Sequence, residues 1–320
     1  MWLPLSAHSS VSASSTLATY RDALTSGRVP TRALYESWSQ SARWLSYHRA
    51  TSPAVTDADV VGTYDQAFRA VQASSHPRLE VVSLGSGGGN KDQRLLKMLG
   101  PRSHIYRPIE VSTSLAFESH RAASPFVKQV DARLVDLEAD LSADAFGPRE
   151  AARLWLVFGL TPSFDLIAFG RRLQAWLQPG DLALISFNLS PGPMPEAKDL
   201  ILPQYANDHA RAWLMGALIE LGIRDDDVQV ATFAASDDPA GEVWHVRVQA
   251  RFRRDVPLRL PDGEIDFARD HELAVFRSNR LTARAATAWM TSLGLEVVSE
   301  FLAEGRQEGV YFAVHNADGG

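Results

Sequence analysis

The sequence contains no cysteine. Disulfide bonds, thiolate metal sites and a cysteine nucleophile are therefore excluded, and the composition fits a cytoplasmic protein. No apolar run approaches the roughly 20 residues of a membrane-spanning helix, and we see no signal-peptide pattern. Acidic residues outnumber basic ones by 38 to 32, so a broad basic surface for nucleic acid is not expected. These features predict a cytoplasmic protein without a membrane or nucleic-acid partner; its oligomeric state stays open.

Several catalytic signatures are missing as well. The chain has no G-x-S-x-G or H-E-x-x-H motif. The acidic run at residues 225–227 lacks the glycine-spaced ligands of a calcium loop, so we expect no metal site. The length of 320 residues and a hydrophobic content of 45% are ordinary for one large or two modest globular domains.

The most informative stretch is residues 79–99, which read as a buried strand, a glycine-rich turn and a helix. The turn contains Gly85, Gly87, Gly88 and Gly89. Such a turn can adopt positive φ angles and bring bare backbone to a ligand at a helix N-terminus. A plain tight turn is the alternative interpretation, because G-x-G patterns are common.

A second strand at residues 105–110 ends in Glu110, where a carboxylate can bind a ribose diol. The glycine turn and Glu110 would also suit a NAD-dependent oxidoreductase. Lys91, however, is not part of the dinucleotide pattern, and the residues around it do not form a P-loop.

Strands continue to alternate with helices as far as residue 188, which predicts an α/β protein with a parallel sheet covered on both faces. We expect a flexible leader at residues 1–16 and a helical segment covering the active site at 17–75. A Rossmann-like ligand-binding domain should follow at 76–190. Residues 191–320 should form a second, α+β domain whose C-terminal helix and strand complete the main sheet.

An ordered set of short motifs then resembles one family. The motifs are Leu84-Gly85-Ser86-Gly87 with Lys91, the Y-x-P stretch at 106–112, Val135-Asp136-Leu137, Phe158-Gly159-Leu160-Thr161 and Pro179-Gly180-Asp181. Together they resemble the histidine-specific methyltransferase family, which contains the ergothioneine-pathway histidine Nα-methyltransferase. The resemblance implies a class I methyltransferase-type doubly wound sheet that binds S-adenosylmethionine (SAM), with an additional α+β substrate-binding domain.

The resemblance also implies roles for residues. The cofactor residues would be Gly85, Ser86, Gly87, Lys91, Glu110, Val111, Ser112, Asp136, Leu137, Phe158, Gly159 and Thr161. The glycine turn and Lys91 would hold the methionine end of SAM. Glu110 would bind the ribose, and Asp136 would accept a hydrogen bond from the adenine amine.

The chain departs from the family at the substrate. Phe164 stands where the family has a carboxylate-binding asparagine, and Phe276 stands where it has a glutamate that binds the imidazole. Ser278 is kept, and Arg280 replaces a lysine. A buried polar substrate group without a partner costs roughly 1–3 kcal/mol. We therefore expect a diverged member with an altered pocket that takes a flatter, less polar aromatic molecule than histidine.

The sequence thus predicts a methyltransferase acting on an aromatic, amino-acid-derived small molecule, such as a tryptophan or indole derivative. Tyr35, Tyr47, Phe164, Phe276 and Ser278 are the predicted substrate-binding residues. Tyr20, Tyr35 and His271 are the candidates for a base or orienting group, needed only if the nucleophile must lose a proton. The alternatives are an amino-acid Nα-methyltransferase, a NAD-dependent oxidoreductase and a non-catalytic SAM-binding module.

Overall fold

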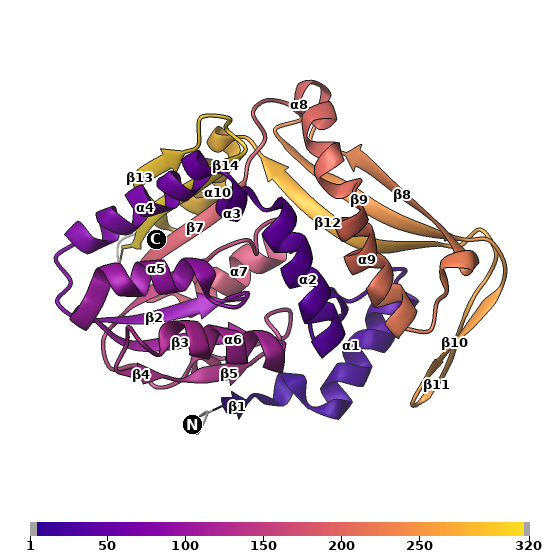
Figure 1. Ribbon diagram of the computed structural model, residues 1–320, viewed down its shortest axis with the longest axis horizontal. Helices are drawn as coiled ribbons and strands as arrows, with labels where there is room; N and C mark the ends of the chain where they lie inside the picture. The colour runs from indigo at the N-terminus through magenta and orange to yellow at the C-terminus, as the bar shows by residue number, and fades with distance from the viewer. Residues whose placement is uncertain (1–4, 317–320) are drawn as a thin grey trace.

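The computed structural model describes residues 5–316, which form a large twisted sheet flanked by helices and a smaller β-rich lobe (Figure 1). The strands of the main sheet are β1 (Leu5–Ala7), β2 (Leu79–Leu84), β3 (Ser103–Glu110), β4 (Gln129–Val130), β5 (Ala132–Leu134), β6 (Ala152–Val157), β7 (Leu182–Asn188), β13 (Leu295–Leu302) and β14 (Glu308–His315). Their order is β1-β5-β3-β2-β6-β7-β14-β13, and β4 pairs with β3.

The sheet is doubly wound. From β2 the chain passes to β3 and β5 on one side, then returns to β6 and β7 on the other. The direction therefore reverses between β2 and β6, and ligands of such sheets bind beyond the carboxyl ends of the strands at this switch point. β14 is antiparallel to both of its neighbours, whereas the other main-sheet pairs are parallel.

Helices cover both faces because the strand residues alternate in direction. Leu154 and Leu156 join the core beneath the helices at 58–73 and 90–99, whereas Trp155 and Val157 join the core beneath the helices at 166–176 and 283–292. The helices of this part are α1 (Ala13–Thr25), α2 (Trp38–Thr51), α3 (Pro53–Thr56), α4 (Ala58–Ala73), α5 (Asn90–Leu99), α6 (Thr113–Ala123), α7 (Leu166–Trp176) and α10 (Ala283–Ser292), with short 3-10 turns η1 (Ser9–Val11), η2 (Thr31–Leu34), η3 (Gly100–Arg102) and η4 (Ala143–Phe146). Within residues 5–316 no helix combines the length and apolar character needed to cross a bilayer.

The smaller lobe lies between β7 and α10 in the chain. It contains α8 (Met194–Ile201), η5 (Leu202–Tyr205), α9 (Asp208–Glu220), η6 (Asp225–Asp227), β8 (Val228–Ala235), β9 (Val243–Phe252), β10 (Val256–Leu260), β11 (Gly263–Phe267) and β12 (Glu272–Leu281). β12, β9 and β8 form an antiparallel sheet, and β10 and β11 form a hairpin. In Figure 1 this lobe stands beside α2, which separates it from the helices of the main sheet.

Two sequence expectations need correction. The serine-rich segment at 5–16 is not a flexible leader: β1 pairs with β5 at the sheet edge, and Ser12 caps α1. The serines that suggested disorder act as caps and hydrogen-bond partners, which composition alone does not reveal. The second lobe, expected over residues 191–320, ends near residue 281, and the main sheet receives two C-terminal strands, β13 and β14, where one was expected. Residues 1–4 of the expected leader lie outside the described part.

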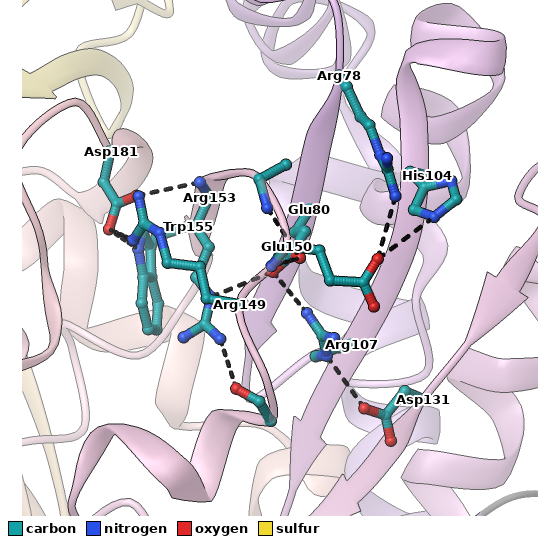
Figure 2. A network of polar contacts seen from close by, with 12 residues as sticks. Arg78, Glu80, His104, Arg107, Asp131, Arg149, Glu150, Arg153, Trp155 and Asp181 are labelled. Atoms are coloured by element: carbon teal, nitrogen blue, oxygen red, sulfur yellow. Dashed lines mark hydrogen bonds and ion pairs between the residues drawn. The ribbon is translucent and has the colours of Figure 1, made fainter.

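A buried ionic network joins the strands at the end opposite the glycine turn (Figure 2). Glu80 is fully buried, and its carboxylate accepts from Arg107 Nη1 at 2.7 Å and from Arg153 Nε at 3.4 Å. It also accepts from the backbone N–H groups of Glu150 and Ala151. Because each lone pair of this buried carboxylate has a donor, the network can hold β2, β3 and β6 in register.

Candidate active site

A cavity of about 220 Å³ lies beyond the carboxyl ends of the parallel strands. Its floor is built by the loops after β2, β3, β5 and β6, and its cover comes from α2 and the smaller lobe. The predicted cofactor residues that line it are Gly85, Ser86, Gly87, Lys91, Glu110, Val111, Asp136, Leu137, Phe158 and Gly159. The cavity thus lies at the switch point of the sheet, and its lining includes residues of the N-terminal helical segment between Thr31 and Ala54.

The glycine turn is shaped for close approach of backbone. Gly85 and Gly87 have φ angles of +57° and +60°. A Cβ atom at Gly85 would lie 2.6 Å from Leu160 Cδ2, and one at Gly87 would lie 2.7 Å from Trp44 Cη2. Glycine is therefore favoured at both positions, because another residue would be strained at these φ angles and its Cβ atom would come too close to a neighbouring side chain.

Glu110 sits directly opposite this turn. Its carboxylate accepts from Gly87 N at 2.6 Å and from Ser86 Oγ at 3.2 Å. Burial raises the pKa of Glu110 to about 7, because desolvation outweighs these hydrogen bonds, which act in the other direction. The group can therefore change charge near neutral pH in the ligand-free protein.

Lys91 is enclosed by aromatic rings. Its Nζ lies 5.0 Å from the Tyr64 ring centre and 5.5 Å from that of Phe158. The Tyr64 hydroxyl donates to Glu308 at 2.5 Å. Burial lowers the pKa of Lys91, while the nearby Glu308 carboxyl opposes that shift. Such a cation, shielded from water, is suited to hold a carboxylate entering the cavity.

Asp136 lines the cavity with its carboxylate already engaged. Oδ2 pairs with Arg32 Nη1 at 3.1 Å, and Oδ1 accepts from Glu138 N at 3.0 Å. Its own backbone N donates to Ser10 Oγ at 3.0 Å. The N-terminal segment therefore fixes the orientation of Asp136 through η1 and η2.

The opposite half of the cavity is aromatic. Tyr47 stacks on Trp213 with ring centres 5.2 Å apart, and Phe276 meets Trp213 edge-on at the same distance. Tyr35 packs between Trp44 at 6.0 Å and Trp213 at 5.7 Å. Since these rings come from α2, α9, β12 and the residue that follows η2, both lobes contribute to the wall.

Phe164, Phe276 and Ser278 all line the cavity. Phe164 is stacked on Phe169, with ring centres 5.2 Å apart, whereas Phe276 packs on Trp213 and Tyr205. Each ring is therefore fixed by its own lobe.

Four of the predicted site residues do not line the cavity. The Tyr20 hydroxyl donates to Glu36 outside the cavity, and His271 is exposed in the turn before β12, against Phe267. Ser112 caps α6, and the Thr161 hydroxyl donates to the Ser186 carbonyl at 3.0 Å. Neither Ser112 nor Thr161 lines the cavity. These four side chains lie apart from the other predicted residues because sequence position does not determine which side of a helix or turn faces a pocket.

Sequence reasoning also missed cavity residues, namely Arg32, Trp44, His48, Tyr205, Trp213 and Glu308, and it noted Arg280 only as a replacement of the family's lysine. One signal was available for α2: Trp44, Tyr47, His48 and Thr51 recur at helical spacing and all line the cavity. His48 stacks on Trp44, and burial lowers the pKa of its imidazole to about 3, so the ring is neutral at neutral pH.

The doubly wound sheet with an inserted antiparallel strand, and a glycine turn facing an acidic strand end, define a class I SAM-dependent methyltransferase. The chain belongs to the histidine-specific, SAM-dependent methyltransferase family, whose sequence model matches residues 53–315. The protein is therefore a SAM-dependent methyltransferase, and the resemblance of its motifs is confirmed. The NAD-dependent and non-catalytic alternatives are wrong.

Solved structures of several methyltransferases are similar. A SAM-dependent methyltransferase from Clostridium acetobutylicum ATCC 824 shares 11% identity with a TM-score of 0.46, over 86% of this chain and 99% of that one. Magnesium protoporphyrin IX methyltransferase from Synechocystis PCC 6803 shares 13% identity with a TM-score of 0.45, over 89% and 97% of the two chains. No curated protein matches the sequence.

Proposed function

We propose that this methyltransferase acts on an aromatic, amino-acid-derived small molecule, with tryptophan or indole derivatives as the favoured class. The observation that carries the proposal is the aromatic half of the cavity, where Tyr35, Tyr47, Trp213 and Phe276 surround the space facing the glycine turn. Stacking against such rings contributes roughly 0.5–1.5 kcal/mol per pair beyond area burial. We also propose that the enzyme is cytoplasmic and acts in secondary metabolism.

The residues of the chain fit the cofactor. The backbone of the glycine turn, Lys91 and Glu110 would hold SAM, which supplies an electrophilic methyl group when bound. The aromatic wall then has to place the nucleophile in line with that group and exclude water, and such positioning supplies much of the rate. Burial raises the pKa of the Tyr35 phenol, so this side chain stays protonated and orients the nucleophile as a neutral hydroxyl.

The experiment is a turnover screen with labelled SAM. Indoles, tryptophan, cyclic dipeptides containing tryptophan, and histidine should be offered separately, and the products analysed for the mass gain of a methyl group. We expect label in an aromatic product, with Gly87→Val as the inactive control. Efficient methylation of free histidine, with no turnover of the aromatic compounds, would overturn the proposal.

A second candidate is an amino-acid Nα-methyltransferase, supported by the family to which the chain belongs. This enzyme would methylate the α-amino nitrogen of its substrate, whereas the first candidate function places the methyl group on the aromatic part. Fragmentation of the product separates the two, because the added mass stays with the α-amino fragment in one case and with the indole fragment in the other.

A further inference from the structure

Arg280 is a buried cation without an acidic partner. Arg280 lies at the end of β12 and is only 2% exposed. Its side chain lines the cavity. The other arginines buried to this degree, Arg32, Arg107 and Arg153, each form an ion pair with a carboxylate. Among residues 5–316, no carboxylate oxygen comes within 4.0 Å of the Arg280 guanidinium. Buried charges are normally paired, so Arg280 needs an explanation.

Most of its hydrogen-bonding capacity is unused. A guanidinium has five N–H donors. Two are used at Nη2, which donates to Gln204 Oε1 at 3.0 Å and to the Tyr205 hydroxyl at 2.8 Å. Nε is buried and has no partner in the described residues. Both partners of Nη2 are neutral, and Glu308, which also lines the cavity, interacts with Arg280 electrostatically without forming an ion pair within 4.0 Å.

The guanidinium is nevertheless held firmly. The Tyr205 hydroxyl that accepts from Arg280 donates in turn to Ser278 Oγ at 2.7 Å. The guanidinium carbon lies 5.7 Å from the centre of the Tyr205 ring. Gln204 is itself fixed by Gln307 at 2.7 Å. A planar fork held in this way is suited to recognise a carboxylate.

We infer that Arg280 anchors the carboxylate of the methyl acceptor, which makes the substrate an aromatic acid rather than a neutral aromatic. This inference rests on the proposed function. The same wall offers a place for the ring, because Phe276 packs 5.8 Å from Tyr205 and 5.2 Å from Trp213. One molecule can thus meet Arg280 with its carboxylate and the aromatic rings with its apolar part.

The test compares the binding of an acid and its neutral counterpart. L-tryptophan and L-tryptophanamide are titrated by calorimetry into protein saturated with S-adenosylhomocysteine (SAH), so that no turnover is needed. We expect wild-type protein to prefer the acid. Arg280→Met should weaken binding of the acid about ten- to a hundredfold, the loss of a charge-assisted hydrogen bond, and leave the amide nearly unchanged. Arg280→Lys should restore part of the affinity.

Arg251→Met is the matched control, because Arg251 is exposed on β9 and pairs with Asp270. SAH affinity and thermal unfolding of each variant report on the cofactor site and the fold. Wild-type protein that binds acid and amide equally, or neither, overturns the inference. A loss of SAH affinity in Arg280→Met also overturns it, because the guanidinium would then serve the cofactor carboxylate. Binding of histidine in place of tryptophan, dependent on Arg280, would keep the anchor and remove the aromatic part of the proposed function.

Discussion

Glu110 should make cofactor binding depend on pH around neutrality. Burial raises the pKa of this carboxyl group to about 7 in the ligand-free protein, and the nearby Asp92 acts in the same direction. A ribose diol donates two hydrogen bonds and requires the carboxylate form. Binding below the pKa must therefore release a proton, and each pH unit below it weakens binding about tenfold.

The expected magnitude follows directly. SAH should bind about tenfold more weakly at pH 6 than at pH 8, and approach a plateau above the pKa of about 7. Calorimetry in buffers of different ionisation enthalpy measures both the affinity and the proton release. Glu110→Gln is the control, because the amide can accept from Gly87 N but does not titrate. A pH profile shared by the wild type and the Gln variant would refute the reasoning.

The raised pKa of Glu110 also makes the stability of the protein decrease as the pH rises. Because the folded-state pKa lies above the ordinary carboxyl value of 4.5, the folded protein binds more protons than the unfolded chain between the two values. The contribution of Glu110 to stability is present at low pH and is lost as the pH rises from about 4.5 to about 7, by on the order of 3 kcal/mol at most. Urea unfolding measures the free energy of unfolding of wild-type and Glu110→Gln protein across this range. The stability of the wild type relative to the Gln variant should be greatest at low pH and fall as the pH rises toward 7.

The remaining predictions concern the turn, the buried network and the pocket. Gly87→Val should abolish SAH binding in calorimetry with the circular dichroism unchanged, since a Cβ there meets the Trp44 ring; retained affinity would remove the turn from the site. Glu80→Gln should lower the free energy of unfolding in urea by about 3–5 kcal/mol, because the buried Arg153 loses its ion-pair partner and Arg107 is left with Asp131 alone (Figure 2); a change below about 1 kcal/mol, as many ordinary substitutions give, would contradict the ionic role. Phe164→Asn combined with Phe276→Glu should raise the KM for the aromatic substrate and give some affinity for histidine, and wild-type kinetics in the double variant would show that these rings do not contact the substrate.

The cofactor half of the site was predictable because its signals are local. The strand, the glycine turn and Lys91 follow one another within residues 79–99, and Glu110 ends the next strand. Their relative placement follows from the parallel pairing of β2 with β3, which any βαβ unit imposes. Glu308 was not predictable in this way, since it approaches Lys91 and Tyr64 only when β14 is inserted beside β7.

Residue type alone does not place a side chain in the cavity. His271, a typical base by residue type, lies in an exposed turn. Tyr20 lies outside the cavity lining, and its hydroxyl donates to Glu36, which pairs with Arg32. The helical periodicity of α2 would have been a better guide, because a face that repeats at Trp44, Tyr47 and His48 must point to one place.

The substrate half of the cavity illustrates a more general difficulty. Its wall combines Tyr47 from α2, Trp213 from α9, and Phe276 and Arg280 from β12, segments far apart in the chain. Each aromatic residue, taken alone, is what any packed helix or strand contains, and an arginine at the end of a strand is usually solvated. Only the folded arrangement shows that the rings surround a space and that the guanidinium beside them forms no ion pair within the described residues. The chemistry of the acceptor therefore depends on what the assembled lobes leave unpaired, and Arg280 is the group on this wall whose charge a substrate would have to compensate.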